Sequence, residues 1–239
     1  MISGESINLG ILFSYEHEEN RCFISTKNYK RVTNFDDEID IDIVKFLLDT
    51  ISKDVEVSIE TLNRPFSIEN YTQYYCNEFN FSNVVEVSYE DAAQKMEEIK
   101  KVYLRYDLPQ SKRATKADEI KLLSQIIKTK TSNTHNNIKI KGKFDDRISI
   151  DIAFDDYYIR IFFITNTNKK QNVNAAKVWA FNCENNEELR KHAITVCQYE
   201  DDLVVDEDVE VIIRILNSLK SYMFSSIDDG IECISHLIK

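Results

Sequence analysis

Residues 138–165 read IKIKGKFDDRISIDIAFDDYYIRIFFIT, and this stretch decides the fold of the second half of the chain. It contains three runs rich in β-branched and aromatic side chains, at 138–144, 148–154 and 157–165. Such runs, separated by short charged segments, predict strands joined by tight turns. Asp155 and Asp156 lie between the last two runs, where we expect a hairpin turn.

Helices are expected on both sides of these strands. Apolar residues at helical spacing predict helices over 115–130, 173–181, 206–224 and 226–237. In the first of them, Ile120, Leu123 and Ile127 fall on one face. A fourth strand is expected at 193–199, so the second half predicts a sheet of three or four strands with flanking helices.

The first half predicts a smaller sheet. We expect its strands at 7–15, 21–26 and 79–89, with a hairpin between the first two. A short helix is expected near 67–76, and a longer one begins at 88 or 89 and ends near 105. A helix over 40–53 follows an acidic stretch, and its apolar face is expected to hold Ile43, Phe46, Leu47 and Ile51.

The chain also opens on a recognisable motif. Residues 4–10 read GESINLG. This resembles the G-E-x-x-N-x-G opening of a bacterial and phage family catalogued as a domain of unknown function. The resemblance covers about residues 1–110. It implies two strands, a helix, and later a strand-then-helix segment. It also implies a setting near mobile elements and host–phage conflict genes, but no activity.

The charge is divided unevenly along the chain. Lys plus Arg total 30 and Asp plus Glu total 41, a formal net charge of −11. Residues 1–110 hold 11 basic and 21 acidic residues, whereas residues 111–143 hold 9 basic and 2 acidic. We therefore predict an α+β protein of two small domains, each an antiparallel or mixed sheet with flanking helices. They are an acidic domain at 1–108, a linker at 109–115, and a domain at 116–239 with a basic first helix and strand.

Composition excludes several functional classes. The 4 glycines are too dispersed to form a phosphate-binding loop, and no two of the 5 cysteines lie at metal-ligand spacing. No apolar run is long enough to span a bilayer, and no signal peptide is recognisable at the start. We expect a cytoplasmic chain with reduced thiols, no cofactor, no metal and no membrane partner.

A metal-dependent nuclease of the restriction-endonuclease-like type is one alternative, active or degenerate. It would use Glu119 and Asp151 as carboxylates for Mg²⁺. The run 157–165 lacks the carboxylate and lysine that this chemistry needs on the next strand, and its one charged residue is Arg160. Alternation along 148–154 places Asp151 on the solvent side of its strand. We therefore expect no catalysis.

The basic stretch predicts a binding surface, because local charge density governs phosphate binding. Its candidate residues are Lys112, Arg113, Lys116, Lys121, Lys128, Lys139, Lys141 and Lys143. Nucleic acid is one possible partner, and the acidic half of a second copy, giving a homodimer, is another. A solvated edge strand protected by lysines is the alternative without function for Lys139, Lys141 and Lys143.

The acidic runs 36–42 and 200–210 suggest a further alternative, an inhibitor that occupies the nucleic-acid-binding cleft of a host protein. Taken together, the residues favour a non-catalytic binding protein. The expected partner is a protein or a second copy of the chain, with nucleic acid as the alternative.

Overall fold

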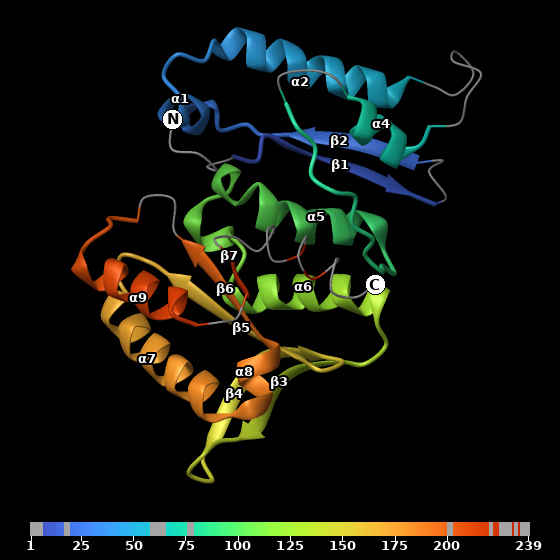
Figure 1. The fold of residues 1–239 in the computed structure, drawn as a ribbon. Helices are drawn as coiled ribbons and strands as arrows, with labels where there is room; N and C mark the ends of the chain where they lie inside the picture. The colour runs from blue at the N-terminus through green and yellow to red at the C-terminus, as the bar shows by residue number, and fades with distance from the viewer. Residues whose placement is uncertain are drawn as a thin grey trace. The chain divides into compact units, whose positions relative to one another are not determined.

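The computed structural model describes residues 7–16, 20–57, 66–75, 79–199, 203–219, 222–224, 231 and 234. These residues form helices, a two-stranded sheet and a five-stranded sheet, which confirms the predicted α+β class (Figure 1). The chain divides into two compact units: unit 1 is residues 1–85 with 89–119, and unit 2 is residues 86–88 with 120–239. The linker expected at 109–115 stays a prediction. No helix in the described ranges has the length and apolar character needed to cross a bilayer.

Unit 1 is built on the predicted hairpin. Strands β1 (Gly10–Tyr15) and β2 (Asn20–Ser25) pair in antiparallel register. The helical elements of this unit are α1 (Tyr29–Phe35), α2 (Ile41–Glu56), α4 (Ile68–Tyr74), α5 (Ala92–Tyr103), η1 (Arg105–Asp107) and η2 (Gln110–Lys112). Helix α2 packs against β2, and α5 packs against β1.

Helix α2 begins where the acidic stretch ends. The Asp40 carboxylate accepts hydrogen bonds from the backbone N–H groups of Asp42 and Ile43, an N-cap that satisfies otherwise unpaired donors. The buried face of α2 consists of Val44, Leu48, Ile51 and Val55, and it forms the core of unit 1 together with Val32.

Two expectations for unit 1 were wrong. The predicted apolar face of α2 included Ile43 and Phe46, yet these side chains are 57% and 69% exposed. Ile51 is buried as predicted, but the rest of the buried face lies one position further along the helix, because β2 packs against the side that holds Val44 and Leu48. Residues 79–89 form neither strand nor helix. Their alternating pattern reflects Phe79 and Phe81 packing onto the core of unit 1 without a strand partner.

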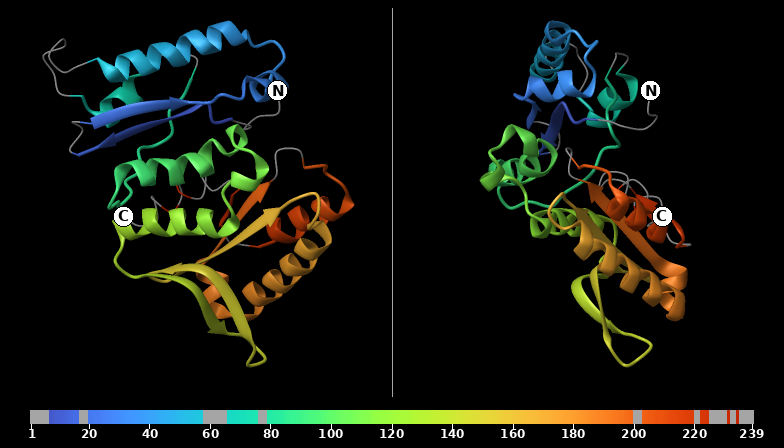
Figure 2. Two further views of the ribbon diagram at one scale, coloured as in Figure 1. Left: turned by 180° about the vertical axis from the view of Figure 1, so that it is seen from behind. Right: turned by 90° about the vertical axis from the view of Figure 1, so that its left-hand side faces the viewer.

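Unit 2 contains a mixed sheet in the order β3-β4-β5-β6-β7. Its strands are β3 (Thr134–Lys141), β4 (Arg147–Phe154), β5 (Tyr157–Ile164), β6 (Ala193–Tyr199) and β7 (Tyr222–Phe224). The first three strands pair antiparallel, and β5, β6 and β7 run parallel. Figure 2 shows the β3–β4 hairpin extending beyond the rest of unit 2 in both views.

The helices of unit 2 connect and cover these strands. They are α6 (Lys116–Lys130), whose first turn belongs to unit 1, α7 (Lys169–Asn185), α8 (Glu187–His192) and α9 (Glu207–Asn217). Trp179 is buried in the core that α7 and α9 share with the sheet, and its indole N–H donates to Thr195 at 2.9 Å. Helix α9 ends at Asn217 and β7 follows, so the helix expected as far as residue 224 was wrong in its last part. The helix expected over 226–237 falls almost wholly outside the described residues.

Candidate functional site

The basic residues expected to bind a partner are divided between the two units. Lys112, Arg113 and Lys116 lie in unit 1. The guanidinium of Arg113 donates to the carbonyl of Leu108 at 3.2 Å and lies 4.9 Å from the ring centroid of Tyr106. This arginine therefore supports the turn that precedes α6.

The other candidates lie in unit 2. Lys121 and Lys128 are exposed on α6. Lys139 and Lys141 are exposed on β3, which is an edge strand as the non-functional alternative expected. Lys143 lies beyond the end of β3, in the turn to β4, so its placement on the strand was wrong.

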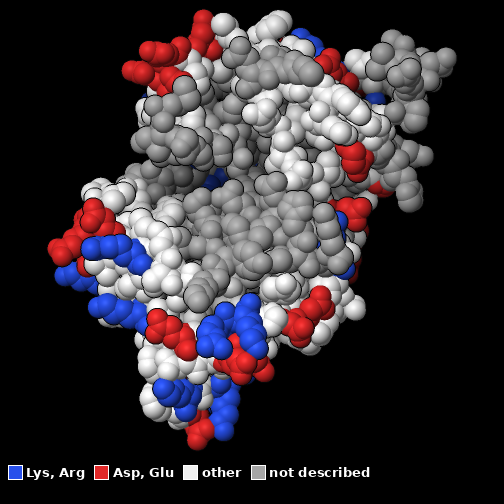
Figure 3. All heavy atoms as spheres, in the orientation of Figure 1, with Lys and Arg blue, Asp and Glu red and all other residues white. Residues whose placement is uncertain are grey.

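A groove of about 590 Å³ lies beside this turn. It is lined by residues 140–143 of the β3–β4 hairpin and by residues 185–188, Lys191 and His192 at the junction of α7 and α8. Acidic and basic side chains alternate over this part of the surface (Figure 3). Lys191 pairs with Glu187 at 2.7 Å, so the groove carries little net charge at that end.

The hairpin tip presents an aromatic pair that the sequence analysis did not single out. Phe144 and Phe181 stack with their centroids 5.9 Å apart and an interplanar angle of 11°. Phe144 is 72% exposed, and Phe181 is 41% exposed. The signal for both was available: Phe144 occurs in a turn of charged residues, and Phe181 lies off the α7 face that buries Ala176 and Trp179.

A second exposed apolar surface lies at the start of α2. We define the α2 surface as Ile43 and Phe46 together with the exposed carboxylates of Asp36, Asp37, Glu38, Asp40 and Asp42. Figure 3 shows acidic side chains gathered at the end of α2 next to α1. Asp42 and Phe46 are four residues apart on the helix, so apolar and acidic groups share one face.

Glu119, one of the two nuclease candidates, is held by an arginine. Its carboxylate is buried in the first turn of α6, and its Oε1 accepts from the Arg105 guanidinium at 3.0 Å. Both residues belong to unit 1, whereas Asp151 belongs to unit 2. Across the part of the chain that the structure describes, no group of three or more His, Cys, Asp or Glu side chains is placed to hold a metal ion.

Asp151 is buried, so the prediction that it faces solvent was wrong. Every residue of β4 from Ile150 to Phe154 is buried, which means that both faces of the strand are covered around Asp151. Only 6% of Asp151 is exposed. Period-two reasoning assumed that one face of the strand is open to solvent, and here neither face is.

The Asp151 carboxylate closes a gap between two strands. The paired register of β4 and β5 covers only Ile152–Phe154 and Tyr157–Ile159. Beyond it, Asp151 Oδ2 accepts from the backbone N–H of Ile161 at 2.8 Å, and the Arg160 guanidinium lies 3.5 Å away. The carboxylate thus substitutes for a carbonyl oxygen of the sheet, which is a structural role.

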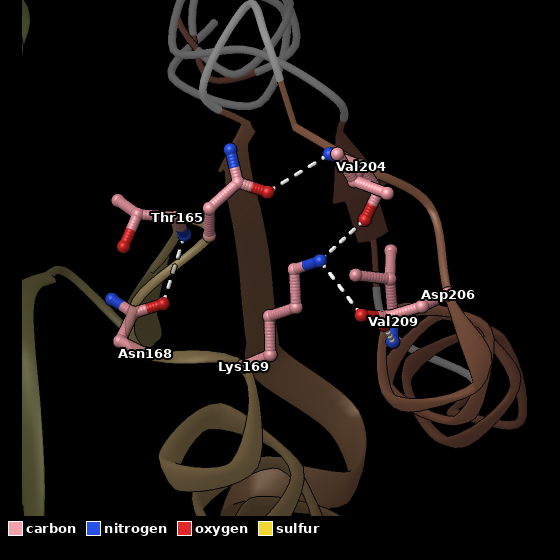
Figure 4. Close-up of polar contacts among 7 residues, drawn as sticks. Thr165, Asn168, Lys169, Val204, Asp206 and Val209 are labelled. Atoms are coloured by element: carbon pink, nitrogen blue, oxygen red, sulfur yellow. Dashed lines mark hydrogen bonds and ion pairs between the residues drawn. The ribbon is translucent and has the colours of Figure 1, made fainter.

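A buried lysine lies where the parallel strands β5 and β6 end, the edge at which α/β sheets often bind ligands. Lys169 is 9% exposed in the first turn of α7. Its amine donates to the carbonyl of Val204 at 2.5 Å and to Asp206 at 2.8 Å (Figure 4). Asp206 is the N-cap of α9 and also accepts from Val209 N–H. Lys169 therefore joins the starts of two helices and is engaged within the fold.

This contact predicts a dependence of stability on pH. The hydrogen bond from Lys169, aided by the N–H of Val209, lowers the pKa of Asp206 below its usual value. A carboxyl with a lowered folded-state pKa stabilises the fold above its unfolded pKa, and that contribution is lost as the pH falls through the folded value. We expect Asp206→Asn to lower the free energy of unfolding at about pH 7 and to have a much smaller effect at about pH 3. Urea denaturation at both pH values measures this, and an equal effect at both would contradict it.

The cysteines and histidines do not form a nucleophilic site in the described part of the chain. Burial raises the pKa of both Cys183 and Cys197 to about 12, so their thiols stay protonated. The His192 ring packs edge-on against Tyr157, and the ring of His135 lies 3.1 Å from the Asn133 side chain. Burial also raises the pKa of Cys22, whose sulfur lies 3.6 Å from that of Met96. Cys76, Cys233, His17 and His236 lie outside the described residues.

No protein-family model, curated protein or solved structure matches this chain. The resemblance of residues 1–110 to a family of unknown function therefore stays a prediction. Residues 4–6 of its motif lie outside the described residues.

Proposed function

We propose that this protein is a non-catalytic binding protein that docks on a basic surface of a partner protein through the α2 surface. The observation that carries the proposal is the exposure of Phe46 and Ile43, 69% and 57%, beside five exposed carboxylates. Exposed apolar groups with a polar rim are typical of protein interaction sites.

The geometry suits such a partner for two reasons. Residues of α2 that hold unit 1 together lie on the opposite face, so Phe46 and Ile43 can be buried by a partner without disturbing the core. The carboxylates at 36–42 attract a basic surface and repel an acidic one, which gives orientation and a faster encounter.

Two alternatives remain open as proposals. The same surface could occupy a nucleic-acid-binding cleft of a host protein as an inhibitor, because such clefts are basic. The other acidic run expected for this role, 200–210, is partly outside the described residues, and within it Asp206 is engaged by Lys169. A setting in host–phage conflict rests on the resemblance of residues 4–10 alone.

A nuclease has less support. Glu119 and Asp151 are each engaged by an arginine of their own unit. A Mg²⁺ site would require both carboxylates to exchange these partners for the metal. An active nuclease and a degenerate nuclease therefore stay proposals, and no contact of Glu119 or Asp151 supports either of them.

Replacing the exposed ring tests the proposed function. We expect Phe46→Ala to weaken partner binding about tenfold or more, because a central aromatic side chain often dominates an interface. Wild-type and variant chains would be used to capture partners from nuclease-treated bacterial lysate, and affinity for the captured protein would then be measured at two salt concentrations.

Tyr74→Ala is the matched control, because Tyr74 is 70% exposed in the same unit but lies on α4. It should leave binding unchanged. Equal affinity of wild-type and Phe46→Ala chains would contradict the α2 surface. If the captured protein is a second copy of the chain, the α2 surface would be a site of self-association instead.

A further inference from the structure

Phe144 and Phe181 form an exposed aromatic pair at the tip of the β3–β4 hairpin, and packing within the fold does not explain why these rings face solvent. Phe144 shows 72% of its surface to solvent, and Val178, one turn before Phe181 on α7, shows 60%. Three apolar side chains are therefore grouped on the outside of unit 2. A ring with one covered face and one open face can accept another flat ring on the open face.

Two lysines lie near this pair. The Lys143 amine lies 5.9 Å from the Phe144 centroid and 6.0 Å from that of Phe181. It donates to the side-chain oxygen of Asn185 at 2.7 Å, a neutral amide that leaves the positive charge uncompensated by that contact. Lys177 is exposed four residues before Phe181, so it lies on the same side of α7.

The carboxylates of the same turn are already engaged. Asp145 pairs with Lys141 at 2.6 Å, and Asp146 Oδ1 accepts from the backbone N–H of Phe144. The exposed carboxylate of Glu184 lies one turn beyond Phe181, so a phosphate chain is expected on the Lys177 side. The N–H that Asp146 accepts is neutral and leaves the charge of this carboxylate uncompensated, and the Lys143 amine is the charged group that lies about 6 Å from both ring centroids.

The tip also holds Phe144 in place. Gly142 N–H donates to the carbonyl of Asp146 at 2.8 Å, which closes the turn. A Cβ on Gly142 would lie 2.2 Å from Asp146 Oδ1, so a side chain at this position would displace the Asp146 carboxylate. A stacking residue on a closed turn loses little conformational entropy when it binds.

We propose that the hairpin tip binds single-stranded nucleic acid, with an unpaired base stacked on Phe144 and the adjoining phosphates near Lys143 and Lys177. Stacking on exposed aromatic rings beside basic side chains is the common mode of sequence-tolerant single-strand binding. Duplex bases are already stacked on one another, so a protruding ring selects single strands.

This site is independent of the proposed function, because it lies in unit 2 and the α2 surface lies in unit 1. The Phe46→Ala variant should bind nucleic acid as the wild type does. Loss of one activity without the other would therefore identify which proposal fails.

The test is fluorescence anisotropy with labelled single-stranded DNA and RNA of about 12 nucleotides, a length within the usual site size. We expect Phe144→Ala to weaken binding about tenfold and Phe144→Trp to retain it, because stacking needs only an aromatic face. Lys143→Gln should weaken binding and reduce its dependence on salt. The DNA and RNA arms show whether the 2′-hydroxyl contributes.

Tyr74→Ala, an exposed aromatic of unit 1, is the control for non-specific loss of a ring. The proposal is overturned if neither strand binds at low salt, if Phe144→Ala binds as tightly as the wild type, or if a duplex binds equally well. A third result would also overturn it: sedimentation shows a dimer of the wild type, Phe144→Ala is a monomer, and no nucleic acid binds. The tip would then be a contact between two copies of the chain.

Discussion

Asp151→Ala should destabilise unit 2 by about 3 kcal/mol. The substitution removes the carboxylate oxygen that accepts from the N–H of Ile161, and it removes the negative charge beside the Arg160 guanidinium. Arg160 keeps its hydrogen bond to the carbonyl of Ser149, but a partly buried cation then lies without its carboxylate. Urea denaturation of the full chain would measure the change as a lower midpoint.

Asp156→Ala is the matched control, because Asp156 is exposed in the turn between the same two strands. Its substitution should change the free energy of unfolding by less than about 0.5 kcal/mol. The experiment also bears on the nuclease alternative. A stable Asp151→Ala chain that loses Mg²⁺-dependent cleavage would refute the structural role and support catalysis.

Lys169→Met should destabilise unit 2 by about 2 kcal/mol. Methionine fills similar space but donates no hydrogen bond, so the carbonyl of Val204 and the carboxylate of Asp206 lose their donor. A lysine in the first turn of a helix is disfavoured by the helix dipole, which offsets part of the loss. The net effect stays destabilising because the amine is nine-tenths buried.

The control for this change is Lys170→Met, at the neighbouring exposed position of α7. Urea denaturation of both variants would compare a buried and an exposed amine on one helix. Equal midpoints for the two variants would contradict the role given to Lys169.

The strands of unit 2 could be predicted because their side-chain patterns are strong and local. The runs 148–154 and 157–165 are bounded by the turn residues Asp155 and Asp156, and β4 and β5 follow them closely. The backbone of Asp155 adopts a left-handed conformation with φ of 45°, which aspartate tolerates. The turn residues and the strand pattern thus indicate the same hairpin, and the two predicted strands are confirmed.

Faces and contacts were harder to predict because they depend on distant residues. On α2 the apolar residues cover more than one face, and only packing against β2 decides that Val44 is buried and Phe46 is exposed. The burial of Asp151 depends on the covering of both faces of β4 and on the hydrogen bond with Ile161, ten residues away. Local periodicity predicts neither the buried face of α2 nor the burial of Asp151.

The candidate site was predicted in part. Lys141 and Lys143, chosen for charge density, do line the groove. The other basic candidates do not line it, because closeness in sequence does not bring a helix, an edge strand and a turn to one groove. Phe181 joins the tip only because α7 returns beside the hairpin, 37 positions after Phe144, and no sequence motif links the two.

The burial of Trp179 has a consequence for how the protein can be observed. It is the only tryptophan in the chain, and it lies in the core of unit 2 with its N–H bonded to Thr195. Its emission therefore reports the melting of unit 2 alone, whereas far-ultraviolet circular dichroism sums the helices of both units. Coincident transitions by the two probes would show that the units unfold as one cooperative system, and separate transitions would show that each folds independently.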